Sequence, residues 1–116
     1  MAYDLNFWKY KSNIYFDNQE VYKRCSEEEI VEGLEELPID SIRKEIENEF
    51  SEWKIDNDSW QNPSGKGAFQ ISNTTQFVRF DCYNMTGDDM NRIIEVLLQF
   101  DCPLYDPQTS TRYDQP

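Results

Sequence analysis

The stretch TQFVRFDCYN, residues 75–84, constrains the fold more than any other segment because its side chains alternate in character. On one side of an extended chain it places three apolar residues, Val78, Phe80 and Cys82. The opposite side carries Phe77, Arg79 and Asp81. Successive side chains of a β-strand point to opposite faces of the sheet, and the charged pair must face water. The pattern therefore predicts a strand with the apolar triplet in the core.

Turn, capping and periodicity signals divide the rest of the chain into further elements. Two helix starts carry side chains that can cap the first turn, Ser26 with Glu29 and Thr86 with Asp89. Strands are predicted at 5–11, 67–73, 75–84 and 102–106. The predicted helices are a short one at 19–25 capped by Asp17 or Asn18, one from Ser26 that stops at Pro38, one capped by Asp40 that reaches Trp53, and one from Thr86 to Phe100. A loop is predicted at 54–67. The last helix is apolar except for Arg92, Glu95 and Gln99, so it is predicted to be the most buried.

This order of elements predicts an α+β fold, a ferredoxin-like split β-α-β sandwich. Two β-α-β crossovers joined by a hairpin give a four-stranded antiparallel sheet with the helices packed on one face. A single domain is expected over residues 1–106, followed by a loose polar C-terminal tail over residues 107–116. The predicted core combines the apolar triplet with Ile46, Phe50, Ile93 and Leu97.

The charge of the chain is strongly negative and unevenly distributed. The formal charge is −12, and Asp17 to Asp58 alone holds 15 acidic and five basic residues. Nucleic acid and anionic lipid surfaces are therefore disfavoured as partners, because binding to phosphates needs a basic patch. A basic protein is the partner that this charge favours, although an acidic surface kept only for solubility explains the same composition.

Catalysis is disfavoured because the chain has no histidine, which removes the usual general base and the common metal ligand. The neighbouring carboxylates Asp88 and Asp89 are explained by the helix start, where negative side chains are favoured. The Asp56–Asp58 spacing resembles the start of a calcium loop, but the later ligand positions do not fit. No phosphate-binding glycine loop is present either, so we expect a protein that is not an enzyme and has no cofactor and no metal.

Cysteine usage and the N-terminal segment bear on the compartment. The three cysteines form no CxxC pair, which disfavours a disulfide framework and a zinc site. The start MAYDLNFWKYK lacks the pattern of a signal peptide, and no apolar run approaches membrane-spanning length. We therefore expect a cytoplasmic protein that does not contact a membrane.

The candidate binding residues are the acidic side chains of this central region and one tryptophan. The stretch SEEEIVEGLEELP holds six glutamates and no basic residue, and the repulsion between them is not compensated within the segment. The predicted partner-binding residues are Glu28, Glu32, Glu35, Glu36, Glu45, Glu49, Glu52, Asp56, Asp58 and Trp60. Trp60 has two interpretations, either an exposed interface anchor or a lid of the core beneath its loop.

Five segments together resemble a group of small, mostly uncharacterised bacterial proteins of about this length: MAYDLNFWKYK, VEGLEELP, GAFQ, FVRFDCYNMTGDDMN and CPLYDPQ. In size and acidity the chain is also similar to immunity proteins of contact-dependent growth inhibition and related polymorphic toxin systems. That resemblance implies an inhibitor that binds a basic toxin domain, often a nuclease, and covers its active site with carboxylates. It carries over no site residues. The alternative is a small regulatory or adaptor protein, or a nucleic-acid mimic, that docks a basic region of a cellular protein.

Overall fold

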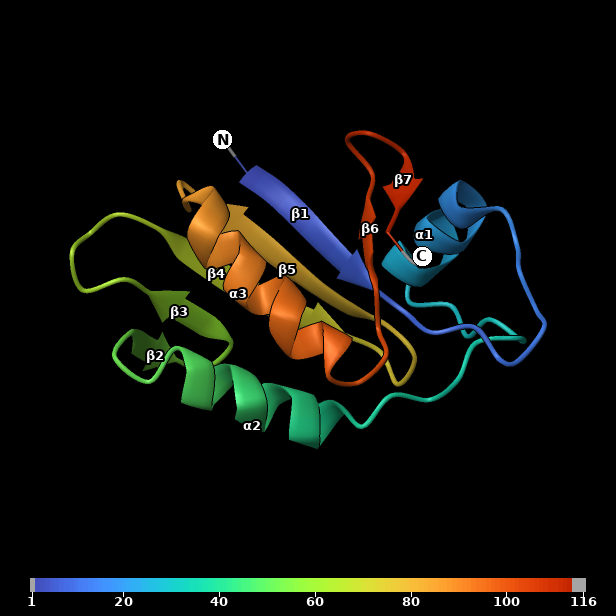
Figure 1. The fold of residues 1–116 in the computed structure, drawn as a ribbon, viewed down its shortest axis with the longest axis horizontal. Helices are drawn as coiled ribbons and strands as arrows, with labels where there is room; N and C mark the ends of the chain where they lie inside the picture. The colour runs from blue at the N-terminus through green and yellow to red at the C-terminus, as the bar shows by residue number, and fades with distance from the viewer. Residues whose placement is uncertain (1, 114–116) are drawn as a thin grey trace.

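The computed structural model describes residues 2–113, which form three helices and seven strands (Figure 1). The helices are α1 (Asn18–Ser26), α2 (Ile39–Glu49) and α3 (Gly87–Leu98). The strands are β1 (Ala2–Phe7), β2 (Lys54–Asp56), β3 (Ser59–Gln61), β4 (Ala68–Asn73), β5 (Val78–Tyr83), β6 (Leu104–Asp106) and β7 (Thr111–Arg112). The predicted α+β class is therefore confirmed.

All strands join one antiparallel sheet in the order β2-β3-β4-β5-β1-β6-β7. The four predicted strands form its middle as β4-β5-β1-β6, with β1 paired to β5 over its whole length. The sheet has seven strands where the sequence predicts four. The added strands extend both edges, β2 and β3 on one side and β7 on the other.

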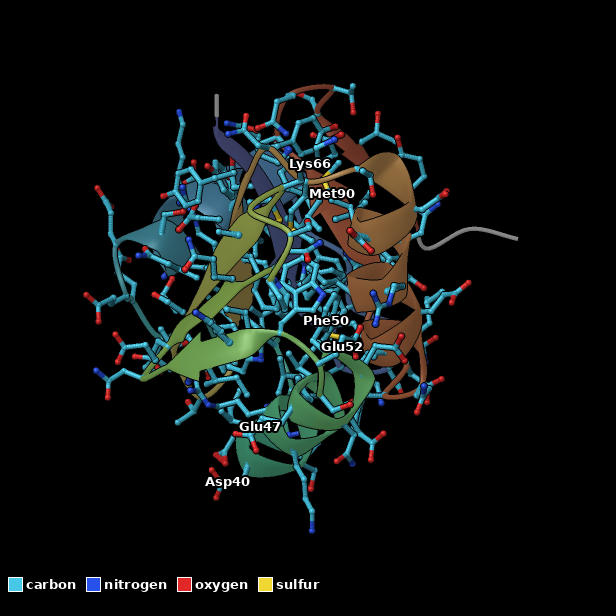
Figure 2. The ribbon with its side chains drawn as sticks, turned by 90° about the vertical axis from the view of Figure 1, so that its left-hand side faces the viewer. Asp40, Glu47, Phe50, Glu52, Lys66 and Met90 are labelled. Atoms are coloured by element: carbon cyan, nitrogen blue, oxygen red, sulfur yellow. The ribbon has the colours of Figure 1, made fainter. Side chains whose placement is uncertain are left out.

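Helices cover both faces of the sheet, so the prediction that all helices pack on one face is wrong. On one face α2 and α3 lie side by side, and their Ile42, Ile46 and Ile93 are completely buried in the main core. On the other face α1 packs through Val21 and Cys25 into a smaller cluster. Figure 2 shows the sheet between α1 on the left and α3 on the right.

The predicted core is confirmed. Its members are all buried: Val78, Phe80, Cys82, Ile46, Phe50, Ile93 and Leu97. Phe77, predicted on the exposed face, is instead 3% exposed, because it stacks against Trp8 at a centroid distance of 6.3 Å in the smaller cluster. In α3, Leu98 is 50% exposed, so the buried face of this helix is narrower than predicted.

Two of the four expected helix caps, those at Asp17 and Thr86, are confirmed, whereas Ser26 caps no helix because it is the last residue of α1. The Asp17 side chain accepts from the Gln19 amide at 2.9 Å, and Thr86 accepts from the Asp89 amide at 3.1 Å. At α2 the prediction is wrong by two positions, because Pro38 occupies the N-cap and Asp40 lies in the first turn. Helix α2 also ends at Glu49, so Trp53 lies in the turn that follows it, where its own side chain is buried.

Four segments differ from the predicted secondary structure. The first strand covers residues 2–7 where 5–11 is predicted, so its second half lies in the connection that follows β1. The helix expected from Ser26 to Pro38 does not form: Ser26 is the last residue of α1, and residues 27–38 are a loop. Within the predicted loop at 54–67, a hairpin of β2 and β3 forms, with Asn57 at a φ of 57° in its turn. In the expected tail, residues 111–112 fold back as β7 and pair with β6. The last three residues of that tail lie outside the described residues.

Candidate functional site

The glutamate-rich segment is the candidate site, and we call residues 27–38 the glutamate loop. Its backbone takes a positive φ at two residues, Glu28 with a φ of 62° and Gly33 with a φ of 103°. The amide of Glu27 already closes α1 on the carbonyl groups of Lys23 and Arg24 at 3.2 Å. Glutamates at helical spacing would repel one another, so neither the backbone nor the charges favour a helix here.

Three apolar side chains fasten the glutamate loop to the protein. Val31 and Leu34 are each 1% exposed, and Leu37 is 7% exposed. Leu37 enters the main core, whereas Val31 and Leu34 join the cluster beneath α1. Ile30, by contrast, is 63% exposed, although its position at helical spacing from Leu34 and Leu37 predicts burial. The loop therefore has its own anchors and is part of the folded structure.

The buried amide of Gln76 holds the loop in place from the turn before β5. Its Oε1 accepts from the Val31 amide at 2.9 Å. Its Nε2 donates to the carbonyl groups of Val31 and Leu34 at 3.0 and 3.1 Å. Gln76 is 6% exposed, so these hydrogen bonds form away from bulk water and fix the loop backbone against the sheet.

Main-chain hydrogen bonds tie the same loop to the segment that follows β1. Gly33 accepts from the Lys11 amide and Glu35 donates to the Lys9 carbonyl, both at 2.8 Å. The positive φ favours glycine at position 33, and a Cβ atom there would lie only 2.6 Å from the ring of Phe16, so that ring would have to move. The exposed ring of Phe16 therefore lies beside the Gly33 turn, and the exposed rings of Phe16 and Tyr15 both contact the ring of Tyr10.

This construction presents carboxylates that have no counter-ion among the described residues. Glu28, Glu32 and Glu36 are exposed and make no ion pair within residues 2–113, and Glu35 is half-buried. Glu29 pairs with Arg24 at 3.2 Å at the end of α1. The loop thus holds a concentrated negative charge in a defined backbone conformation.

The other predicted site residues do not share this arrangement. Arg92 of α3 bonds to Glu49 at 2.8 Å and to Glu52 at 3.2 Å, and its guanidinium lies over the Phe50 ring. These contacts join α3 to the end of α2. A hydrogen bond from its own backbone amide, followed by that from Arg92, lowers the pKa of Glu52.

The remaining predicted residues lie on or near the β2–β3 hairpin and on α2. Asp58 pairs with Arg43 at 2.6 Å, Asp56 is exposed in β2, and Glu45 of α2 is half-exposed. Trp60 is completely buried and stacks on Phe69 at 5.1 Å, so its interpretation as an exposed anchor is wrong and it is part of the core. Figure 2 shows Asp40 and Glu47, two further acidic residues of α2, pointing outward.

A polar cluster on the α1 face was not predicted. Asp4 of β1 accepts from the Tyr22 hydroxyl at 3.1 Å and lies 3.7 Å from Arg79, which also pairs with Asp81 at 2.9 Å. Burial, followed by the charge of Asp4, raises the pKa of Tyr22. The alternation of residues 75–84 places Arg79 and Asp81 on one face, but only the register of β1 on β5 brings Asp4 opposite Asp81.

The three cysteines are free thiols and all are buried. Burial raises the pKa of Cys25 to about 11 and those of Cys82 and Cys102 to about 12. A thiol reacts as its thiolate, so these side chains are poor nucleophiles at neutral pH. They pack as small apolar residues.

Neither a protein-family model nor a curated protein matches this sequence. Between residues 2 and 113, no cluster of three or more histidine, cysteine or carboxylate side chains is arranged to hold a metal ion. None of the helices in that part of the chain has the length and apolar character needed to cross a membrane. The fold and the site therefore define a small α+β protein whose most distinctive surface is an anchored acidic loop.

Proposed function

We propose that this protein binds a basic partner protein through the glutamate loop and acts by that binding rather than by catalysis. The observation that carries the proposal is the combination of exposed, unpaired carboxylates with a loop backbone fixed by Gln76. A loop that is already ordered loses little conformational entropy when it binds. Its negative field also speeds the approach of a positively charged partner.

The partner that we propose is a toxin domain, which makes the protein an immunity protein. The resemblance in size and acidity motivates this step, and the charge of the loop supports it. Carboxylates placed over the active site of a basic nuclease would occupy the positions of substrate phosphates. A cytoplasmic location belongs to the same proposal, because an immunity protein meets its toxin there. Direct contact with nucleic acid or with a membrane forms no part of it.

The fold is compatible with a more specific proposal about its origin. The four middle strands lie in the order β4-β5-β1-β6, and α2 and α3 cover one face. This strand order supports the assignment of a split β-α-β unit. We propose that the protein is an elaborated member of that fold class, in which the β2–β3 hairpin, β7 and α1 are additions.

The proposal is tested by reversing charges on and away from the loop. The double variant Glu32→Lys/Glu36→Lys removes loop carboxylates, and Glu47→Lys/Glu95→Lys makes the same change in net charge at exposed positions of α2 and α3. With polylysine of fixed length as the probe, we expect association of the loop variant to slow by about tenfold or more at low salt. The control variant should slow much less, and the difference should shrink as salt rises.

Equal slowing of the two variants would contradict the loop as the binding site, since only the net charge would then matter. The toxin itself is sought by affinity capture from the native host. A captured basic toxin domain that is inhibited by the parent protein, but not by the loop variant, is the expected result.

A further inference from the structure

A groove lies between α3 and β6, away from the glutamate loop. Helices α2 and α3 do not extend over the β6 edge of the sheet, and Figure 1 shows β1 running between α3 and β6. The groove left there has a volume of about 430 Å³. Its apolar walls come from Leu5 of β1, Met90 and Ile94 of α3, and Leu104 of β6. It is built from elements other than the glutamate loop.

The carboxylate of Asp106 lies in this groove and has no cationic partner among residues 2–113. Asp106 is 4% exposed and forms no ion pair with any lysine or arginine of the described chain. It is held by neutral donors: the Tyr3 hydroxyl, the Gln108 side-chain amide, and the Gln108 backbone amide at 2.9 Å. A buried carboxylate without a counter-ion is stabilised by any cation that can reach it.

The shape and chemistry of the groove select an aliphatic chain that ends in a cation. Lysine side chains place their methylene stem on apolar surface and their ammonium group on a polar one. We infer that this groove binds a lysine side chain of a basic partner, with the stem against Met90 and Ile94 and the ammonium group on Asp106. The inference rests on the proposed function, since it names the residue with which the basic partner is anchored.

The hydrogen bonds already made by Asp106 favour lysine over arginine. Oδ1 accepts from both nitrogens of Gln108, whereas Oδ2 accepts from Tyr3 alone within the described part of the chain. A guanidinium group binds best when both carboxylate oxygens are available for its two parallel donors. An ammonium group needs one oxygen, and the ring of Tyr113 at the rim of the groove offers it an additional aromatic face.

The test is a titration of the whole protein in which the amide resonances of α3 and β6 are monitored by NMR spectroscopy. The probe is Nα-acetyl-lysine-methylamide. The comparison ligands are the norleucine derivative, which lacks the charge, and the arginine derivative, which carries a planar guanidinium group. We expect the lysine derivative to bind with a Kd on the order of millimolar, because a single side chain makes few contacts. The norleucine and arginine derivatives should bind more weakly.

Variants of the groove make the test specific. Asp106→Asn should weaken lysine binding by about tenfold or more, whereas Asp88→Asn, the same charge change at an exposed position of α3, should leave it nearly unchanged. If Asp106→Asn unfolds, Asn91→Trp keeps Asp106 and covers the groove from the exposed side of α3, and it should also reduce binding.

Four results would overturn the inference: equal binding of norleucine, stronger binding of arginine, equal effects of the two aspartate variants, or shifts that follow protein concentration alone. The last would show a second copy of the chain in the groove. The polylysine experiment on the glutamate loop does not depend on this groove, so the proposed function and the groove can fail separately.

Discussion

Gln76 is a buried amide that contacts Val31 and Leu34, which lie 45 and 42 residues away in the chain. No sequence pattern marks such a contact, because glutamine in a turn ordinarily faces water. Its effect is to replace, for one part of the glutamate loop, the hydrogen bonds that a helix would have supplied. The conformation of the acidic site thus depends on one side chain outside it.

We predict that Gln76→Ala lowers the free energy of unfolding by about 2–4 kcal/mol, because it leaves a buried amide and two carbonyl groups without partners. Urea denaturation measures the change. The control is Gln70→Ala, an exposed position of β4, which should change stability by no more than about 0.5 kcal/mol. A comparable small change for Gln76→Ala would mean that water replaces the side chain, and that the loop does not depend on it.

Tyr3 is a second residue of interest, because its raised pKa makes the stability of the protein depend on pH. The hydrogen bond to Asp106, together with burial, raises the pKa of Tyr3 to about 12, from an ordinary value of 10.0. A raised pKa in the folded protein means that the folded state holds its proton where the unfolded state has lost it. Its contribution to stability is therefore complete below pH 10 and is lost as pH rises toward 12.

We predict that the parent protein loses more stability than Tyr3→Phe between pH 10 and pH 12. The pKa values of Tyr22, Tyr105 and the three buried cysteines are also raised, but these groups are common to both proteins and cancel in the comparison. Urea denaturation at several pH values, with tyrosinate absorbance as the second readout, measures the difference. Parallel stability curves would show that the Tyr3–Asp106 hydrogen bond does not persist in solution.

At the level of elements, α3 gives the sharpest comparison between two neighbouring side chains. Leu97 is completely buried, whereas Leu98 is 50% exposed. We predict that Leu97→Ala costs about 2–5 kcal/mol in stability, the range for large-to-small changes in a core. Leu98→Ala makes the same chemical change on the exposed side and should cost about 0.5 kcal/mol or less. Similar losses in denaturant unfolding would contradict the orientation of this helix.

Elements with a strong local pattern were predictable, and elements set by distant contacts were not. The strands at β4 and β5 and the helix from Thr86 follow from alternation, apolar periodicity and capping. The capping-box pattern at Ser26 was misleading, because the preceding helix continues through that residue and Gly33 takes a positive φ. The β2–β3 hairpin was missed because its strands are only three residues long and lie among turn-forming residues.

The candidate site was predictable in composition but not in form. The glutamates of residues 27–36 are evident in the sequence, whereas their placement on an anchored loop depends on Gln76 and on the chain after β1. The ion pairs of Glu49 and Glu52 with Arg92 join residues about 40 positions apart, so charge counting alone could not separate them from the loop. Burial of Trp60 follows from the register of β3 on β4, which a loop prediction does not include.

At the scale of the whole molecule, the sheet is wider than one layer of helices can cover. Helices α2 and α3 lie on one face and α1 lies on part of the other, so some sheet surface on each side has no helix over it. The groove at β6 is one result. The widening comes from short strands at both edges, and short edge strands limit unwanted pairing with other chains.

Net charge is the property of the whole molecule that should respond most directly to solution conditions. A formal charge of −12 on 116 residues opposes compaction through self-repulsion. Salt screens this repulsion, with a Debye length of about 8 Å at physiological ionic strength. Salt also weakens the ion pairs of the surface, but exposed pairs contribute little each, so the repulsion should dominate.

We therefore predict that the Tm of the parent protein rises as sodium chloride is increased from low concentration toward about 0.15 M. The rise should be smaller in Glu32→Lys/Glu36→Lys, because its formal charge is −8 and the crowded loop gains two cations. Glu47→Lys/Glu95→Lys has the same net charge but keeps the loop intact, so its rise should lie between the two. Thermal melts monitored by circular dichroism provide the measurement. A Tm that falls with salt in the parent would mean that the ion pairs around Arg92 and Arg43 outweigh the repulsion. An equal rise of Tm with salt in the two variants would mean that the glutamate loop contributes no more to the repulsion than other exposed carboxylates do.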